Sequence, residues 1–298
     1  MTDALATREL GKQYGRLWAL RDCTVTIPAG RVVGIVGPNG AGKTTLLHLA
    51  DGLLRPTCGA IEVLGTRPGG ATDHLARVGF VAQDTPVYDR FSVADHLRLG
   101  AWLNPKWDET LGMQRVRLLG LDPLRKAGRL SGGQRAQLAL TLAIAKRPEL
   151  LILDEPVASL DPLARREFHQ SLMEVVAENG VTVLLSSHLV TDLERVCDYL
   201  VVMVASKPRL YGEVDVLLRS HRLLTGPRRS TSEMPASQHV IAYSHRGRQS
   251  SFLVRTDEPI FDPSWTVDEV GLEDLALAYM TNPERPSAAH HTALEMVR

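Results

Sequence analysis

An eight-residue glycine-rich segment places the strongest constraint on how this chain can fold. Residues 37–44 read GPNGAGKT and fit the pattern G-x-x-x-x-G-K-[ST]. The apolar residues 32–36 before the segment predict a buried strand, and a helix is expected to follow at Lys43. In this arrangement, backbone N–H groups and the positive end of the helix can surround phosphate oxygens. The segment therefore predicts a nucleotide site in which Lys43 reaches the β- and γ-phosphates and the Thr44 hydroxyl binds Mg²⁺.

Two further apolar runs end in polar side chains. Residues 150–153 precede Asp154 and Glu155, and residues 181–185 precede a Ser-Ser-His triplet. Continuous apolar strands separated by amphipathic stretches predict a parallel sheet with helices on both faces, and ligands bind at the carboxyl ends of such strands. Asp154 can then hold Mg²⁺ through its water shell, and Glu155 can polarise a water molecule in line with the γ-phosphate. An acidic pair that only caps the sheet edge is the alternative.

A second candidate anion site lies at the start of another predicted helix. Residues 130–134 read LSGGQ and precede the apolar run at residues 138–145. The Ser131 hydroxyl and the glycine N–H groups would face a ligand at this helix N-terminus. Since one nucleotide needs only one cradle, the most economical use of the second site is to receive the γ-phosphate of a nucleotide held by another subunit. A capped helix without a ligand is the alternative.

The order and spacing of these motifs resemble the nucleotide-binding subunit of ATP-binding cassette (ABC) transporters over about residues 5–215. The resemblance implies an α/β P-loop NTPase cassette with a parallel-sheet core, an antiparallel β subdomain and a helical insertion at about residues 85–145. Within this insertion, residues 93–103 and 114–119 are the clearer predicted helices. The cassette is expected to occupy residues 1–218. Residues 219–298 are expected to form a small α+β C-terminal extension, because the composition changes at about residue 218.

The extension is predicted to begin with a linker. Residues 221–237 are rich in Arg, Ser, Pro and Gly, and their arginine cluster (Arg222, Arg228 and Arg229) is interpreted as part of a solvated linker. Contact of this cluster with lipid headgroups is the alternative. Short strands are predicted at residues 240–243 and 251–255, and a helix at residues 272–280. The polar residues 281–298 are expected to be frayed.

The resemblance also implies roles for individual residues. Glu155 is implied to be the general base, His188 to contact the γ-phosphate, and Gln83 to touch Mg²⁺ and the attacking water. Tyr14 is implied to stack on adenine. The implied contacts to ATP are Tyr14, Gly37, Asn39, Gly40, Gly42, Lys43, Thr44, Thr45, Ser131, Gly132, Gly133, Gln134 and Asp161, and those to Mg²⁺ are Thr44, Gln83 and Asp154. Simple packing of Tyr14, a solvated amide at Gln83, a structural His188 and a plain helix cap at Asp161 are the alternatives.

The net charge and hydropathy of the chain indicate which kinds of binding partner to expect. The 34 basic and 34 acidic side chains cancel, so the chain has no overall field to attract nucleic acid, and no nucleic-acid partner is expected. The three cysteines are far apart, which argues against a disulfide framework or a zinc site. No apolar run approaches the roughly 18 residues that cross a bilayer. With the resemblance, this implies a separately encoded membrane permease, docked near residues 83–103, and a second nucleotide-binding subunit in a homodimer or heterodimer. The chain is then expected at the cytoplasmic face of the cell membrane.

The function that follows is hydrolysis of ATP to drive transport. Residues 37–45, 104–108 and 271–280 are similar to bacterial drug and multidrug exporters more than to nutrient importers. Export of a drug-like or natural-product substrate is therefore expected, with an importer subunit as one alternative. A soluble ABC ATPase that acts on DNA or ribosomes is another, although such proteins usually carry two cassettes or a long coiled coil. A nucleotide-gated scaffold without turnover is the third.

Overall fold

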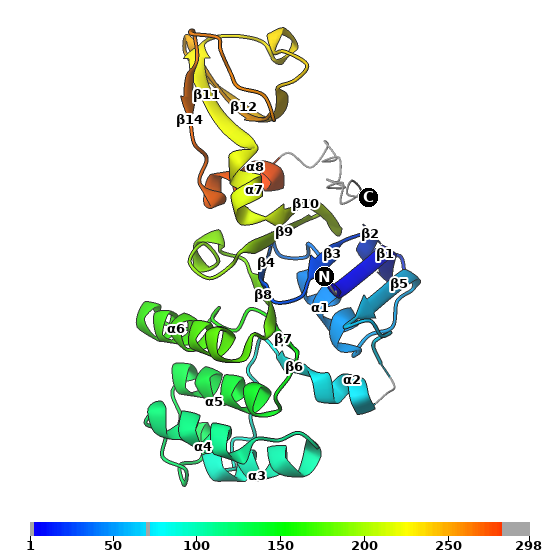
Figure 1. Ribbon diagram of the computed structural model, residues 1–298, viewed down its shortest axis with the longest axis vertical. Helices are drawn as coiled ribbons and strands as arrows, with labels where there is room; N and C mark the ends of the chain where they lie inside the picture. Colours follow the sequence, from blue (N-terminus) through cyan, green and yellow to red (C-terminus); the bar gives the residue numbers. More distant parts are fainter. Residues whose placement is uncertain (1–2, 70–71, 282–298) are drawn as a thin grey trace, which may run out of the picture.

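The computed structural model describes residues 3–69 and 72–281, which form an elongated molecule (Figure 1). A six-stranded sheet crosses its middle in the order β10 (Lys207–Glu213), β9 (Tyr199–Val204), β4 (Val32–Val36), β8 (Thr182–Ser187), β7 (Leu150–Leu153) and β6 (Val78–Val81). The pairs from β9 to β6 are parallel, which confirms the predicted parallel core. Strand β10 pairs antiparallel with β9 and adds an edge that the sequence analysis did not predict.

One face of this sheet is covered by helix α1 (Lys43–Asp51) and a second, antiparallel sheet. In the second sheet, the long strand β1 (Asp3–Tyr14) pairs with β2 (Leu17–Cys23), β3 (Thr26–Pro28) and β5 (Cys58–Val63). Buried side chains from the three layers share one core, in which Leu5 of β1 and Ile35 of β4 pack with Leu46 of α1. The antiparallel β subdomain implied by the family resemblance is therefore present.

Helices cover the opposite face. Helices α5 (Gly132–Ala145), α6 (Pro162–Asn179) and α8 (Leu272–Thr281) contribute Leu140, Phe168 and Leu275 to a core that also contains Leu151 and Leu200 of the sheet. Because both faces are covered, every residue of β4, β7, β8 and β9 is buried, which explains why these strands read as continuous apolar runs.

The predicted helical insertion lies at one end of the molecule (Figure 1). It contains α3 (Val93–Leu103), α4 (Glu109–Leu118), the 3₁₀ turn η1 (Ala127–Arg129) and α5, packed around Leu97, Val116 and Leu138. The helix predicted at residues 93–103 is confirmed. The helical segment predicted near residue 114 begins earlier, at Glu109, because the Asp108 carboxylate accepts the Leu111 N–H and caps the helix. Helix α2 (Thr72–Arg77), which precedes β6, was not predicted.

The extension forms a third sheet at the opposite end of the molecule (Figure 1). After α7 (Val214–Arg219), the strands β12 (His239–Arg246), β13 (Gln249–Arg255), β11 (His221–Pro227) and β14 (Thr266–Asp268) lie side by side and antiparallel. The strands predicted at residues 240–243 and 251–255 and the helix at 272–280 are confirmed. The division of the chain into two domains at residue 218 stays a prediction. Helix α8, which lies in the predicted extension, packs onto β9 and the turn η2 (Val190–Asp192) of the predicted cassette.

The prediction of a solvated linker is wrong. Its first seven residues form β11, which pairs with β13 along its whole length. The Arg229 guanidinium donates to Asp262 at 2.7 Å and lies 5.0 Å from the centre of the Trp265 ring. Composition alone indicated a linker, whereas the partners that fix this segment lie between 22 residues (Pro227 and Gln249) and 45 residues (Leu223 and Asp268) away in the sequence. The frayed end predicted from residue 281 lies outside the described residues, except for Thr281, which ends α8.

Candidate nucleotide-binding site

The glycine-rich segment curls between the end of β4 and the start of α1. A Cβ atom at Gly37 would lie 2.2 Å from the Met203 carbonyl oxygen, so only glycine fits there. Gly42 has a φ of 100°, and a Cβ atom at this position would lie 2.6 Å from the Ala19 carbonyl oxygen. These close approaches make the tight backbone curve possible, with Asn39 and Gly40 exposed at its rim.

The curve leaves amide donors at the start of α1. Gly42 is the N-cap and offers no side-chain acceptor, and the first helical hydrogen bond runs from the Leu46 N–H to the Gly42 carbonyl oxygen. The N–H groups of Lys43, Thr44 and Thr45 therefore lack helical acceptors. Together with the positive end of the helix, they favour an anion such as a phosphate.

The Lys43 side chain lies inside the cradle and is only 5% exposed. Its Nζ donates to the Gly37 carbonyl oxygen at 2.8 Å and lies 3.2 Å from Oε1 of Glu155. A buried ammonium group requires such partners. Phosphate oxygens in the cradle would offer it stronger acceptors than the carbonyl group.

Oxygen ligands suitable for Mg²⁺ lie beside the cradle. The Thr44 hydroxyl donates to Oδ1 of Asp154 at 3.2 Å, and the same carboxylate oxygen accepts the Ser186 hydroxyl at 2.7 Å. A hydroxyl and a carboxylate are the hard donors that Mg²⁺ prefers. Among the described residues, no cluster of three His, Cys, Asp or Glu side chains could hold a metal ion. Thr44 and Asp154 therefore fit an ion whose other ligands are phosphate and water.

Three interactions hold Glu155 in place. Its Oε1 faces Lys43, its Oε2 lies 3.1 Å from Nδ1 of His188, and its N–H donates to the Ser186 hydroxyl at 2.8 Å. The backbone φ of Glu155 is 44°, in the left-handed region that non-glycine residues rarely adopt. The Ser186 hydroxyl fixes this conformation by bonding both Asp154 and Glu155.

Ser186 is the residue whose role the sequence analysis missed. The sequence places it at a strand end, but its contact with Asp154 depends on β7 and β8 being neighbours, in the register that pairs Leu153 with Leu185. A buried hydroxyl at the end of a strand beside the acidic pair was the only available signal.

Gln83 and Tyr14 lie at the exposed margin of the site. Gln83 follows β6 by two residues, and Val81 of β6 pairs with Leu153, the residue before Asp154. Its exposed side chain thus projects from the strand end next to the acidic pair. Tyr14 ends β1 with its ring half exposed, and Nζ of Lys12 lies 5.3 Å from the ring centre. The ring is accessible for stacking by a base.

The second predicted anion site is placed at the start of α5. The Ser131 hydroxyl accepts the Gln134 N–H at 3.2 Å, and the Gln134 side chain accepts the Ser131 N–H at 3.1 Å. Asp161 similarly caps α6, because its carboxylate accepts the N–H groups of Leu163 and Ala164. Within this single chain, Ser131 and Asp161 therefore act as helix caps, as the alternative interpretations of these two residues stated.

Residues of these two caps share a groove of about 470 Å³ between α5 and α6, lined by Ser131, Gly133, Gln134 and Asp161 among others. Within residues 3–69 and 72–281, no hydrogen bond or ion pair joins residues 131–134 to the cradle. The structure thus brings together Lys43, Thr44, Asp154, Glu155 and His188, and leaves the second anion site apart.

Comparisons with known proteins identify the family. Residues 20–158 match the sequence model described as ABC transporter. The chain is 35% identical over 211 residues to the molybdenum import ATP-binding protein ModC of Mesorhizobium japonicum, covering 67% of this chain and 57% of that protein. It is 34% identical over 215 residues to the Nod factor export ATP-binding protein I of Rhizobium johnstonii, covering 70% of this chain and 69% of that protein.

The chain belongs to the ABC transporter family. The solved structure of cbiO1 from Clostridium perfringens, described as part of the ABC transporter complex cbiONQ, matches this ABC protein with a TM-score of 0.63 and 28% identity. The match covers 72% of this chain and 89% of that chain. The ABC protein therefore has the P-loop cassette fold, and it spans just over half the length of its molybdenum-import relative.

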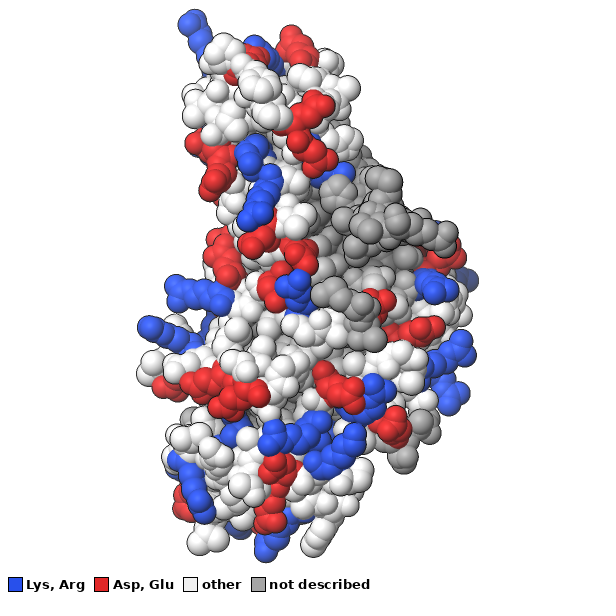
Figure 2. Space-filling view, viewed as in Figure 1, with Lys and Arg blue, Asp and Glu red and all other residues white. Residues whose placement is uncertain are grey.

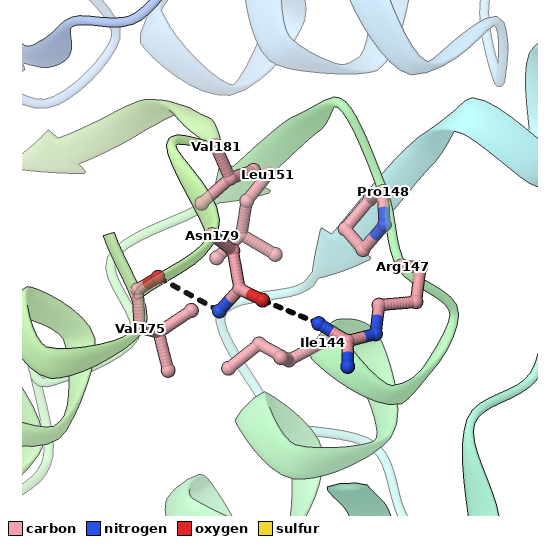
Figure 3. A pocket seen from close by; sticks show the side chains of 7 residues that line it. All are labelled: Ile144, Arg147, Pro148, Leu151, Val175, Asn179 and Val181. Atoms are coloured by element: carbon pink, nitrogen blue, oxygen red, sulfur yellow. Dashed lines mark hydrogen bonds between the residues drawn. The ribbon is translucent and has the colours of Figure 1, made fainter. Parts of the chain in front are cut away.

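A smaller cavity of the ABC protein lies away from the nucleotide cradle (Figure 3). It has a volume of about 150 Å³, and the Arg147 guanidinium donates across it to Asn179, which in turn donates to the Val175 carbonyl oxygen. Two of its lining residues mark the beginnings of strands, because Leu151 is the second residue of β7 and Val181 immediately precedes β8. Since Asp154 and Ser186 lie at the other ends of these strands, the cavity is separate from the predicted nucleotide-binding and catalytic residues.

Proposed function

We propose that this ABC protein hydrolyses ATP and thereby drives a separately encoded membrane permease. The observation that carries the proposal is the position of Glu155, whose carboxylate lies between Lys43 and His188 directly beside the Thr44–Asp154 pair. A carboxylate at this place can take a proton from a water molecule aligned with the γ-phosphate. No helix of the described residues is long and apolar enough to cross a membrane, so the proposal includes a membrane partner.

Within this proposal, each residue near Glu155 has a role in binding or hydrolysing ATP. Lys43 and the first amides of α1 bind the phosphates, and Mg²⁺ held by Thr44, Asp154 and Gln83 would neutralise their charge. His188 orients Glu155 and contacts the γ-phosphate. Tyr14 stacks on the adenine.

The second anion site supports a head-to-tail dimer. In the proposed closed state, Ser131, Gly132, Gly133 and Gln134 of one copy bind the γ-phosphate of ATP held in the cradle of another copy, and Asp161 lies at the seam. The separation of this site from the cradle within one chain supports this arrangement, because the two sets of donors can then meet one nucleotide only across two subunits. Closure by ATP and opening after hydrolysis form a two-state cycle.

The permease is proposed to dock on the helical insertion. The segment that we call the docking loop, residues 84–92, leads from Gln83 into α3, and the far end of α3 exposes Trp102 and Leu103 by 80% and 70%. Large exposed apolar side chains are typical of interaction sites. Acidic and basic side chains lie interspersed on the face seen in Figure 2, which supports a protein partner over nucleic acid. The ABC protein would then lie at the cytoplasmic face of the membrane.

Export of a drug-like or natural-product substrate is the proposed direction. The chain covers a larger share of the Nod factor export protein than of the molybdenum import protein. Import is the second candidate, since the identity to the import protein is as high. Inside-out vesicles that contain the neighbouring permease distinguish the two: exporters accumulate substrate inside them when ATP is added, whereas importers do not.

The substitution Glu155→Gln tests the proposed chemistry. It removes the base and keeps the side-chain shape, so ATP binding should persist while hydrolysis falls by at least about 100-fold. The variant should form a dimer with ATP and Mg²⁺, measured by light scattering after gel filtration. Glu178→Gln, on the exposed side of α6, is the matched control and should behave like the parent. Parent-like hydrolysis by Glu155→Gln would refute the assignment of the base.

A further inference from the structure

His96 is a buried histidine without a role in the proposed chemistry. It lies near the start of α3, is 4% exposed, and makes two specific hydrogen bonds. Nδ1 lies 2.8 Å from the Ser92 carbonyl oxygen, and the Tyr88 N–H donates to Nε2 at 3.0 Å. Because a carbonyl oxygen only accepts, Nδ1 carries the hydrogen and Nε2 is the acceptor. His96 thus fixes the backbone of the docking loop at Tyr88.

Aromatic contacts close the docking loop around this imidazole. The Tyr88 ring stacks on His96 with a centroid distance of 6.1 Å, and the Phe91 ring meets it edge-on at 5.7 Å. Tyr88 and Phe91 also contact each other at 5.2 Å, and the Phe91 N–H donates to the Tyr88 carbonyl oxygen. These contacts stabilise the loop conformation seen in the structure, and the acceptor at Nε2 contributes one of them.

The same loop is bonded to the segment that leads to Ser131. The Gly128 N–H donates to the Asp89 carbonyl oxygen at 3.0 Å, and the Ala127 N–H donates to the Phe91 carbonyl oxygen at 2.9 Å. A Cβ atom at Gly128 would lie 3.1 Å from that Asp89 oxygen, so the two chains are in close contact. Only Arg129 and Leu130 separate Gly128 from Ser131, the cap of α5.

Arg135 of α5 adds a side-chain link between the same partners. Its Nη2 donates to the Gly128 carbonyl oxygen at 3.2 Å, and its Nη1 lies 3.7 Å from the Asp89 carboxylate. The docking loop, η1 and the start of α5 are thus joined by main-chain and side-chain bonds. As long as these bonds hold, a displacement of the docking loop therefore also moves Ser131.

We propose that His96 is a positioning residue that couples the docking loop to Ser131. It holds Tyr88 and Phe91 so that the carbonyl groups of Asp89 and Phe91 receive the amides of Gly128 and Ala127. A membrane partner that displaces the loop thereby moves the second anion site. His96 touches neither nucleotide nor reacting atoms, and the inference rests on the proposed function of the Ser131 site.

Amide hydrogen exchange of the full chain tests the hydrogen-bonded link directly. His96→Leu removes the acceptor at similar volume, whereas the Oε1 atom of His96→Gln can still accept from Tyr88. In His96→Leu, the amides of Tyr88, Ala127 and Gly128 should exchange at least about tenfold faster, and in His96→Gln near the parent rate. Unchanged exchange at Ala127 and Gly128 in His96→Leu would overturn the proposal, as would equal exchange in the Leu and Gln variants.

His74 provides the matched control. It is also a buried histidine, and its Nε2 lies 3.1 Å from the Asp51 carbonyl oxygen, outside the helical insertion. His74→Leu should leave exchange at Ala127 and Gly128 unchanged. If it accelerates exchange as much as His96→Leu, the effect is general loosening and the link is refuted.

Dimerisation tests the consequence for Ser131. In the Glu155→Gln background, His96→Leu should weaken ATP-dependent dimerisation by about tenfold and leave binding of a fluorescent ATP analogue unchanged. Gly128→Ala introduces a methyl group close to the Asp89 carbonyl oxygen and should also weaken dimerisation. His96→Gln, which keeps the acceptor, should dimerise like the parent. Parent-like dimerisation of both His96→Leu and Gly128→Ala contradicts the coupling. If Glu155→Gln alone fails to dimerise, the proposed function fails, while hydrogen exchange still tests the link.

Discussion

The imidazole Nδ1 of His188 lies 3.1 Å from Oε2 of Glu155, and the other carboxylate oxygen of Glu155 faces Lys43. The Glu155 carboxylate is thus shared between His188, which follows β8, and Lys43 of the cradle. Phosphates that enter the cradle compete with Glu155 for Lys43. We therefore expect nucleotide binding to free Oε1 for contact with water while His188 keeps Oε2 in place.

Replacing Lys43 should weaken nucleotide binding. Hydrogen bonds to charged groups contribute about 1.5–3 kcal/mol, so Lys43→Met should weaken binding of a fluorescent ATP analogue by about 10- to 150-fold. The control is Lys207→Met, because Lys207 pairs with Asp22 on the exposed surface. Lys207→Met should bind like the parent, and equal affinity of the two variants would refute the role of Lys43.

Removing the Ser186 hydroxyl should harm both stability and activity. The hydroxyl joins the Asp154 carboxylate to the Glu155 amide, and its loss leaves a buried N–H group unsatisfied. Ser186→Ala should lower the free energy of unfolding by about 1–3 kcal/mol, measured in urea, and lower kcat more than it raises KM. Ser171→Ala, at a buried site on α6, is the control. A parent-like kcat in Ser186→Ala would show that the strained backbone of Glu155 holds without this hydroxyl.

Acid should destabilise the extension through Asp262. The Ser264 hydroxyl and the Arg229 guanidinium lower the pKa of Asp262 from its ordinary value of 3.8 to about 2. Since the pKa is depressed in the folded state, the stabilisation is complete above pH 3.8 and is lost as the pH falls towards 2. Thermal unfolding should show the parent to be more stable than Asp262→Asn above pH 4, with the difference disappearing near pH 2. A difference that stays constant across this range contradicts the assignment.

Shortening Leu275 tests the packing of α8 on the cassette. Leu275 is fully buried in the core that α8 shares with the sheet. Leu275→Ala should lower the free energy of unfolding by about 2–5 kcal/mol. Leu277→Ala on the exposed side of the same helix should change it by less than about 0.5 kcal/mol. Equal effects of the two substitutions would show that α8 does not share the cassette core.

Local patterns predicted the elements whose residues interact mainly with sequence neighbours or lie in uniformly buried strands. The cradle follows from residues 37–44, and β7 and β8 follow from uninterrupted apolar runs. Strand β1 was harder to recognise because register shifts, such as the one between Arg8 and Gly11, interrupt the alternation of buried and exposed residues. Within the site, the residue types were predictable, but the contacts of Glu155 required the order of strands in the sheet. Arg229 was misinterpreted because its partner Asp262 is 33 residues away.

The packing of α8 against η2 and β9 has a consequence for the exchange of parts between relatives. Leu275 and Leu193 belong to one core, and η2 follows His188 by only one residue. A chimaera that replaced residues 219–298 alone would set a foreign helix against the segment that follows His188. Compatible grafts would need matching residues at η2 and β9, so α8 and the segment from η2 to β9 are expected to vary together among relatives.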